Sequence, residues 1–441
     1  MAAGSPPRGR GGSGVAVERT RAERRTSQNR RPVVQVRPSG KPKNACPFSF
    51  HVVWIIALVL LVVGLCMMLS VSAARGLTSP GEDKYLYVKQ QGITAIAGLV
   101  GMILVSRLDY RKLRGASVVV LAFMAGVLLF MHVPGVSESE GGASSWIPLG
   151  PLTFQPSEFA KLAVVLAGAH LLSMPRSRRD DFKSFMLPFG AAGMVMCLLV
   201  LAEPDLGTAI IIAGLLLGLL WIAGMKVRHW IMLAGAGAAA TLALTFSSST
   251  RMARVLSFLN PAADPHGASF QLSQSLVALG RGGWFGVGPG ESVQKFSYLP
   301  EAHTDMIFAI LGEEFGLIGA GLVILLLGAL ALACWRLARR CADPMGRYLI
   351  AGCGMLVTLQ AVVNIGGVIG AMPLTGVPLP FISYGRNSLI VMLLAVGLIL
   401  SVARSAPASR VPSDVTRYEN VTDIDRRRGD RWARGARSGA R

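Results

Sequence analysis

A dense polar block, Tyr298–Glu314, interrupts a chain that is otherwise rich in apolar runs. Within it, His303, Thr304 and Asp305 follow one another directly before a hydrophobic stretch. Ionisable groups at the edge of hydrocarbon are expensive to keep, so such a block indicates a functional site. Carboxylates at functional sites commonly exchange protons with substrate, and Asp305 is therefore the first residue to test.

Three further polar segments lie at the ends of apolar runs. In Gln155–Lys161, Glu158 and Lys161 are three positions apart and can pair on one helical face. Glu203–Thr208 has the composition of a tight turn, and Pro373–Gly385 interrupts the apolar pattern before the last run. A lone Glu–Lys pair can simply neutralise itself, but several such segments on one face favour a shared polar cavity.

The chain has 441 residues, of which 52% are hydrophobic and 15% charged, against about 25% charged in a typical soluble domain. Apolar runs of about 17 to 25 residues are long enough to cross a bilayer as helices. Ten such runs begin near His51, Tyr87, Gly115, Glu158, Met186, Leu206, His229, Asp305, Tyr348 and Ser388. We therefore predict an all-α membrane protein with ten transmembrane helices and with both termini on one side.

The distribution of Lys and Arg predicts which side that is. Eleven of them fall in residues 1–50 and ten in residues 404–441, and most others lie in four short connections between the runs. Cytoplasmic segments carry the excess of Lys and Arg, so both termini are predicted to be cytoplasmic. The long segment 248–304, between the seventh and eighth runs, is then an extracytoplasmic loop.

The sequence divides into a basic N-terminal tail (1–50), a membrane domain (51–404) and a basic C-terminal tail (405–441). The tails lack apolar periodicity, which predicts disorder and attraction to anionic lipid headgroups. They supply most of the net charge of +20, so we predict no binding to nucleic acid. Six scattered cysteines without a Cys-x-x-Cys pair indicate neither a metal site nor a disulfide framework.

The long loop contains two recognisable segments. Phe270–Leu279 has apolar residues at spacings of two to four, which predicts a short amphipathic helix in the membrane interface. Gly280–Gly290 follows, and the backbone amides of such a run can cradle an anion. A structural turn is favoured for these glycines because the phosphate-loop pattern is absent. Lys295 is the nearest compact cation for a phosphate.

From Asp305 the chain runs to Trp335 without a proline. A continuous helix there would be about 46 Å long, against roughly 30 Å of hydrocarbon. Below the acid, small residues recur on one helical face, at Ala309, Gly312 and Gly316. This stripe indicates either close helix packing or a groove for a lipid tail whose headgroup lies at Asp305.

Five segments, in this order, resemble those of the SEDS family (shape, elongation, division and sporulation), the ten-span peptidoglycan polymerases. They are Trp146–Gly150, Phe154–Lys161, Glu203–Thr208, Tyr298–Glu314 and Pro378–Gly385. Elongation members usually have an Arg at the position of Ala302, so the chain is most similar to the cell-division branch.

The chain departs from the family pattern at two places. Ser144 and Ser145 precede Trp146, where the family commonly has an Arg. Arg386 follows Gly385, where the family commonly has a second Gly. Arg386 either replaces a missing cation that faces phosphate or is a solvated loop residue.

The resemblance implies polymerisation of lipid II into glycan strands at the division septum of a bacterial plasma membrane. Asp305 matches the residue that the family uses as general base, with inversion at the anomeric carbon. The residues implied to bind substrate are Trp146, Gln155, Glu158, Lys161, Lys295, His303, Ser383 and Arg386. Glu158 is expected to orient Lys161, and His303 either tunes Asp305 or holds the loop.

The leaving pyrophosphate needs positive charge, for which Lys161, Lys295 and Arg386 are the candidates. The sequence requires no cofactor and indicates no metal ligands, although a divalent cation is compatible with the chemistry. Expected partners are lipid II, the undecaprenyl-pyrophosphate-linked glycan, a class B penicillin-binding protein and other division proteins. A lipid II transporter, a non-catalytic division scaffold and an elongation polymerase remain open as alternatives.

Overall fold

The computed structural model describes residues 47–78, 85–133, 138–140, 143–149, 152–174, 182–203, 205–246, 249–260, 269–296 and 299–405. The predicted basic tails fall almost entirely outside these ranges, as does Tyr298. The described helices are α2 (Pro47–Thr78), α3 (Leu86–Arg107), η1 (Tyr110–Lys112), α4 (Leu113–Phe130), α5 (Pro156–Leu172), α6 (Phe182–Ala202), α7 (Leu206–Ile222), α8 (Val227–Phe246), α9 (Ser249–Leu259), α10 (Phe270–Gly282), α11 (Ile307–Arg340), α12 (Pro344–Val368) and α13 (Arg386–Ser405).

The helices agree with the predicted apolar runs. Each of the ten runs begins inside a helix or, for Asp305, two residues before one. Among the described residues, six helices are long and apolar enough to cross a membrane. They are Phe50–Ala73 within α2, α3, Tyr110–Phe130, α11, α12 and α13. Two shorter apolar helices, Pro188–Ala202 and Leu206–Ile222, accompany them. A mostly helical membrane fold is thus confirmed, while the crossing of all ten runs stays a prediction.

A small antiparallel sheet departs from the all-α expectation. It contains β1 (Glu138–Glu140), β2 (Ala143–Leu149) and β3 (Leu152–Phe154), in that order. Trp146 lies opposite Glu138, and Ile147 lies opposite Phe154. This three-stranded sheet lies directly before α5 in the chain, and strands this short leave little periodicity in a sequence.

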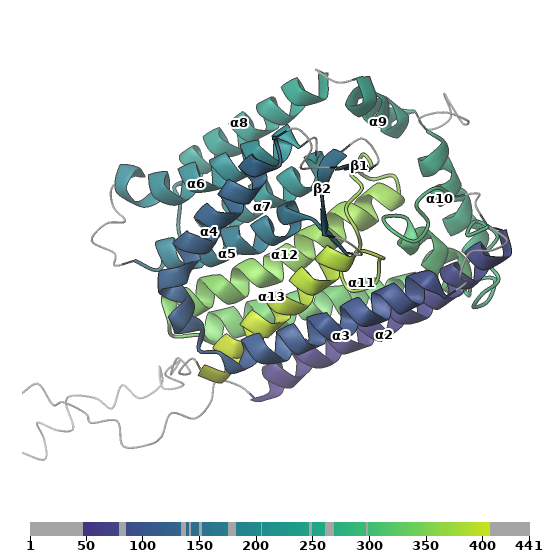
Figure 1. Cartoon of the computed structure of the whole chain (residues 1–441), viewed down its shortest axis with the longest axis horizontal. Helices are drawn as coiled ribbons and strands as arrows, with labels where there is room; N and C mark the ends of the chain where they lie inside the picture. The colour runs from purple at the N-terminus through teal and green to yellow at the C-terminus, as the bar shows by residue number, and fades with distance from the viewer. Residues whose placement is uncertain are drawn as a thin grey trace, which may run out of the picture. The chain divides into compact units, whose positions relative to one another are not determined.

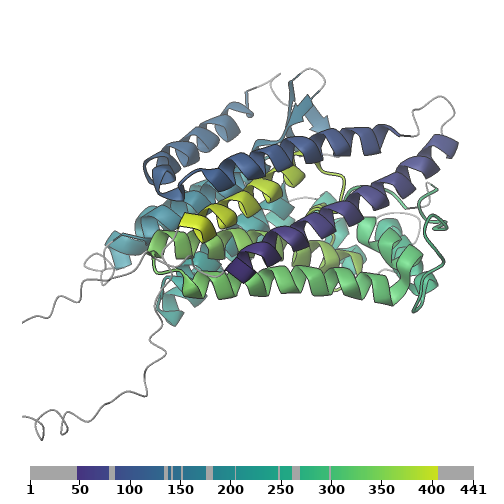
Figure 2. The same cartoon turned by 90° about the horizontal axis from the view of Figure 1, so that it is seen from below.

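The centre of the bundle consists of α5, α12 and α13, whose residues are buried over most of their length. In Figure 1, α13 lies between α12 and α3, with α2 beside α3. In both views the start of α2 and the end of α13 lie at one end of the bundle, and α10 lies at the other (Figures 1 and 2).

Local signals explain where several helices begin. The Asp205 carboxylate accepts a hydrogen bond from the Thr208 amide at 2.9 Å, and Asp343 does the same for the Gly346 amide at 2.9 Å. Such N-caps satisfy amides that have no partner inside the helix. Pro156 and Pro344 occupy the first turns of α5 and α12, where a missing N–H costs nothing.

The predicted unbroken helix after Asp305 is wrong in two respects. The helix begins only at Ile307, so Asp305 lies in a turn and does not share a helical face with Ala309. The helix also breaks at Gly316, whose φ of 66° and ψ of −166° are non-helical. A side chain at this φ and ψ is strongly disfavoured, so glycine is required for the break.

Candidate active site

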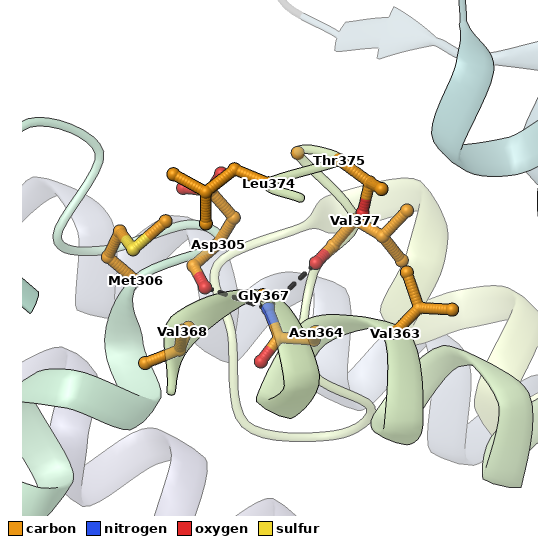
Figure 3. A pocket seen from close by; sticks show the side chains of 10 residues that line it. Asp305, Met306, Val363, Asn364, Gly367, Val368, Leu374, Thr375 and Val377 are labelled. Carbon is orange, nitrogen blue, oxygen red and sulfur yellow. Dashed lines mark hydrogen bonds between the residues drawn. The ribbon is translucent and has the colours of Figure 1, made fainter. Parts of the chain in front are cut away.

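Asp305 lies in the last turn before α11, and its side chain is nearly buried, with 9% exposed. The Thr304 hydroxyl approaches its Oδ1 at 3.4 Å. Asp305 lines a small hollow, open to solvent, between this turn, the end of α12 and the loop after α12 (Figure 3). The other lining residues are Met306, Val363, Asn364, Gly367, Val368, Leu374, Thr375, Gly376 and Val377. The predicted catalytic acid therefore lies beside a cavity.

Asn364 connects the two loops at this pocket, and it is not among the site residues predicted from the sequence. Its amide nitrogen donates to the backbone carbonyls of Asp305 at 2.7 Å and Val377 at 2.8 Å (Figure 3). Asn364 is buried within the apolar helix α12. A buried amide in an apolar helix needs hydrogen-bond partners, which was a signal available in the sequence.

The predicted pair of Glu158 and Lys161 forms on α5. Lys161 Nζ lies 2.6 Å from Glu158 Oε1, and the lysine is 0% exposed. The same Nζ donates to Gln360 Oε1 at 2.9 Å. Gln360 in turn donates to the Pro378 carbonyl at 3.0 Å and to the Ser388 hydroxyl at 2.8 Å. Gln360 thus links the Glu158–Lys161 pair to Pro378, the residue after Val377 of the pocket lining.

The loop Pro373–Gly385 is held along its length. The Ser383 hydroxyl accepts from the Leu379 amide at 2.7 Å, and Gln91 donates to the Ser383 carbonyl at 3.1 Å. Phe381 is buried and has a φ of 65° although it is not a glycine. Such a conformation persists only where the surroundings enforce it.

Arg386 and Asn387 connect the start of α13 to strand β3. Arg386 donates to the Thr153 hydroxyl at 2.9 Å, and Asn387 donates to the Thr153 carbonyl at 3.0 Å. Arg386 forms no ion pair within the described part of the chain. Its contacts place it beside the ribbon that carries Trp146, which is half-buried in β2. Gln155 precedes α5 and makes no capping hydrogen bond through its side chain.

His303 belongs to an aromatic cluster with Tyr87 and Tyr384. Its ring centroid lies 4.6 Å from that of Tyr87 and 5.6 Å from that of Tyr384. Its backbone carbonyl accepts from the Tyr384 amide at 2.8 Å, and the Tyr384 hydroxyl donates to Gln90. These contacts support the holding of the loop, one of the two roles expected for His303.

Lys295 forms a second buried ion pair, with Glu314 on α11, at 3.0 Å. Ser70 on α2 joins the pair, since its hydroxyl donates to Glu314 at 2.6 Å and accepts from Lys295 at 2.9 Å. The neighbouring Glu313 accepts from the Ser292 hydroxyl and from the Val293 amide. Both glutamates thus have the partners that their burial requires. Lys295 does not line the pocket at Asp305.

The glycine-rich segment fills the break in α11. The amides of Val287 and Gly288 donate to the carbonyls of Glu313 and Glu314 at 3.0 and 3.1 Å. The amides of Leu317 and Ile318 donate to the carbonyls of Gly283 and Trp284 at 2.9 and 3.2 Å. The structural turn favoured from the sequence is therefore confirmed, since these amides bind protein carbonyls.

The small-residue stripe of α11 is covered by protein. A methyl group on Gly312 would collide with Leu279 of α10, and one on Gly316 would collide with Gly286 and Trp284. Close packing explains these glycines, and among the described residues this face presents protein contacts in place of the expected lipid groove. The predicted helix 270–279 is confirmed as α10. Its Ser275 donates to the Val368 carbonyl at 3.0 Å, so it packs against α12 as well as α11.

The turn between α6 and α7 carries an acid of unusual surroundings. Glu203 is 2% exposed, and neither carboxylate oxygen has a hydrogen-bond partner among the described residues. Burial, and secondarily the charge of Asp205, raises the pKa of Glu203 from 4.5 to about 8. Ser157, next to Glu158, donates to Asp205 at 3.3 Å. In the described ranges no three His, Cys, Asp or Glu residues form a group that could hold a metal ion.

Comparisons of this chain with known protein families and proteins agree with this architecture. The family described as cell cycle proteins, which groups FtsW, RodA and SpoVE, matches residues 50–407. Stage V sporulation protein E of Bacillus subtilis is 39% identical over 79% of this chain and 95% of its own length. A probable peptidoglycan glycosyltransferase FtsW of Mycobacterium tuberculosis is 38% identical over 81% of this chain and 68% of its own.

Solved structures show the same fold. A chain from work titled "Structural coordination of polymerization and crosslinking by a peptidoglycan synthase complex" has a TM-score of 0.66 and 27% identity, covering 80% of this chain and 96% of that one. The rod shape determining protein RodA of Thermus thermophilus has a TM-score of 0.58 and 27% identity, with coverages of 80% and 95%. The chain therefore belongs to the FtsW, RodA and SpoVE family of cell cycle proteins, the SEDS family, as a multi-pass membrane protein most like FtsW.

Proposed function

We propose that this chain is a peptidoglycan glycosyltransferase that polymerises lipid II into glycan strands. Family membership supports the proposal, because several relatives are named probable peptidoglycan glycosyltransferase FtsW. The observation that carries it is the position of Asp305 beside a pocket, with its backbone tied to α12.

Asp305 is the general base in this proposal. The 4-hydroxyl of the acceptor sugar attacks the anomeric carbon of the donor sugar, and its proton passes to the Asp305 carboxylate. The new C–O bond forms as the bond to the lipid pyrophosphate breaks, so the polyprenyl pyrophosphate leaves. A single displacement inverts the anomeric centre from α to β. General-base assistance of this kind contributes about 10² to 10⁴ in rate.

The leaving pyrophosphate requires cations or amide donors. Lys161 and Lys295 are each within 3.0 Å of a glutamate, whereas Arg386 contacts a neutral hydroxyl. We therefore assign the contact with phosphate first to Arg386. Either lysine could contact phosphate only after its ion pair with glutamate breaks. Trp146, Gln155, His303 and Ser383 remain candidates for contacts with the sugars, with Glu158 as the residue that orients Lys161. A divalent cation is compatible with the proposal but has no identified ligands.

The proposed topology has ten transmembrane helices, cytoplasmic termini and an extracytoplasmic loop at 248–304. The Lys and Arg distribution supports it, as does the location of the start of α2 and the end of α13 at one end of the bundle. The domains follow as a basic N-tail (1–50), the membrane domain (51–404) and a basic C-tail (405–441). Asp305 and the pocket then face the side on which glycan strands accumulate.

The proposed partner is a class B penicillin-binding protein, at the division septum of the plasma membrane. The similar solved chain comes from a peptidoglycan synthase complex described as coordinating polymerization and crosslinking, which supports a partner of this kind. Ala302 and the FtsW relatives favour division over elongation. Depletion in cells separates these roles, since loss of a division enzyme gives filaments and loss of an elongation enzyme gives rounded cells.

The experiment supplies purified protein, with and without its class B penicillin-binding protein, with labelled lipid II and resolves the glycan chains on a gel. We expect polymer from the wild type and an at least 100-fold slower reaction from Asp305→Asn. Glu301→Gln is the matched control, because this exposed acid lies on the same turn. Equal polymerisation by wild type and Asp305→Asn would refute the catalytic assignment. Movement of lipid II across liposome membranes without polymer would support a transporter. The absence of both activities would support a scaffold.

A further inference from the structure

Two amide side chains one helical turn apart on α12 hold the loop that follows this helix. Gln360 donates to the carbonyl of Pro378 at 3.0 Å, and Asn364 donates to the carbonyl of Val377 at 2.8 Å. Residues four apart lie on the same face of a helix, so the two amides bind consecutive carbonyls of one loop segment.

Each amide also reaches a second part of the site. Gln360 accepts from Lys161 at 2.9 Å, and Asn364 donates to the carbonyl of Asp305 at 2.7 Å. At the start of α11, the Ala309 amide donates to the carbonyl of Met306 at 2.9 Å.

The segments that Asn364 joins both contain strained backbone. Glu301, four residues before Asp305, has a φ of 52°, and Phe381, four residues after Val377, has a φ of 65°. Non-glycine residues in this region cost free energy and persist only where surrounding contacts enforce them. The Asn364 amide donates to both segments (Figure 3).

The amide of Asn364 is not explained by packing alone. Its Oδ1 is buried and has no hydrogen-bond partner among the described residues, so the side chain keeps an uncompensated polar atom in the core. Both hydrogens of its nitrogen are used on backbone carbonyls, which fixes which end of the amide faces the loops. A carboxylate of the same shape would present only acceptors to these carbonyls.

We propose that Asn364 is a positioning residue for the glycosyl transfer: it fixes the backbone of Asp305 against the loop Pro373–Gly385, so that the carboxylate meets the acceptor hydroxyl in the reactive geometry. Gln360 holds the same loop one residue further on and ties it to the Glu158–Lys161 pair. This inference rests on the proposed function for its catalytic part, and the clamp itself is testable without activity.

The variants are Asn364→Ala, Asn364→Asp and, as matched control, Thr358→Val. Thr358 lies on the same helix, and among the described residues its hydroxyl donates to the Gly354 carbonyl, four residues earlier. Hydrogen–deuterium exchange in nanodiscs compares peptides covering 299–308 and 374–384 with a reference peptide from α13. We expect at least tenfold faster exchange in both site peptides for the two Asn364 variants, and no change for Thr358→Val or for α13. Unchanged exchange in either site peptide would overturn the clamp, whether or not the protein polymerises lipid II.

The kinetic arm uses the folded fraction of each variant, in complex with the class B penicillin-binding protein. A misplacement of about 1 Å costs roughly 10² in rate, so we expect kcat to fall about 100-fold with KM within about threefold. In the Asp305→Asn background, Asn364→Ala should add almost no further loss, because the group it positions is gone. Multiplicative losses, or a KM effect larger than the kcat effect, would overturn the positioning role.

The two proposals fail differently. Polymer from the wild type, a slow Asp305→Asn and a fully active Asn364→Ala would refute the inference and leave the proposed function intact. Wild type without polymer would refute the proposed function and with it the positioning role, and the exchange experiment would still decide whether Asn364 joins the two loops.

Discussion

The described residues contain two buried lysine–glutamate pairs, and the pairs are built in opposite ways. Lys161 and Glu158 lie three positions apart on α5, so folding of one helix brings them together. Lys295 and Glu314 are 19 positions apart, and their pair joins a loop to α11 and, through Ser70, to α2. The first pair forms within one helix, and Lys161 bonds from there to Gln360 of α12, whereas the second pair exists only when three elements are assembled.

The difference determines what each pair can do. Removing one member of a buried pair leaves an uncompensated charge, and the cost depends on the donors that remain. Glu158 Oε2 already lacks a partner among the described residues, while Glu314 keeps the Ser70 hydroxyl. We therefore expect the α5 pair to support the bundle as a whole, and the α11 pair to hold the loop locally.

The largest effect is expected from Lys161→Met, which removes the cation from Glu158 in the core of the bundle. The loss should be about 3–5 kcal/mol of unfolding free energy. Thermal unfolding in detergent measures it, and the double variant Glu158→Leu/Lys161→Met should recover most of the loss. A single variant as stable as the wild type would show that the Glu158–Lys161 pair does not stabilise the fold.

The next largest effect is expected from Gly316→Ala, which disrupts the packing of residues 283–288 against the break in α11 without removing a charge. An alanine at φ 66° and ψ −166° is strained, and its methyl group would collide with Gly286. We expect a loss of about 3 kcal/mol from strain and overlap. Gly321→Ala, on the same helix with open space around it, is the control and should be neutral or slightly stabilising. Equal unfolding temperatures for the two variants would contradict the required break.

Lys295→Met should have a smaller and more local effect, of about 1–3 kcal/mol. Hydrogen exchange should accelerate in residues 286–296 and remain unchanged in α5. The result that contradicts the comparison is a uniform acceleration over the whole bundle, as expected for Lys161→Met.

Glu203 supplies a third case, a buried acid that forms no ion pair among the described residues. Its pKa of about 8 lies above the ordinary 4.5, so the folded state binds the proton more tightly than the unfolded state. Wild type should therefore lose stability as the pH rises from 4.5 to 8. Glu203→Gln removes this loss, so its unfolding temperature should equal that of wild type near pH 4.5 and exceed it by about 5 °C at pH 8. A temperature difference that is independent of pH would show that Glu203 does not titrate in this range.

The sequence predicted what depends on local spacing. Apolar runs located the helices, and a spacing of three located the Glu158–Lys161 pair, because both follow from helical periodicity. The break at Gly316 was missed because Gly283–Gly288, distant in sequence, replaces the hydrogen bonds of the broken turn. The partners of Lys295 and the two bonds of Asn364 were missed for the same reason. The polar residues around Asp305 identified it as a candidate from the sequence. Its pocket could not be predicted, because the lining residues come from segments far apart in the chain.

The hydrogen bond from Gln91 to the Ser383 carbonyl joins positions 292 apart in the chain. Gly64 of α2 similarly packs against the backbone of Phe381 and Ile382, with no room for a side chain. During synthesis at about 5–20 residues per second, α2 and α3 emerge some 15 to 60 seconds before these contacts exist. The polar atoms of Gln91 must meanwhile find water, lipid headgroups or an insertion factor. The first helices made are therefore among the last to be finished, and truncated chains would leave them without a core.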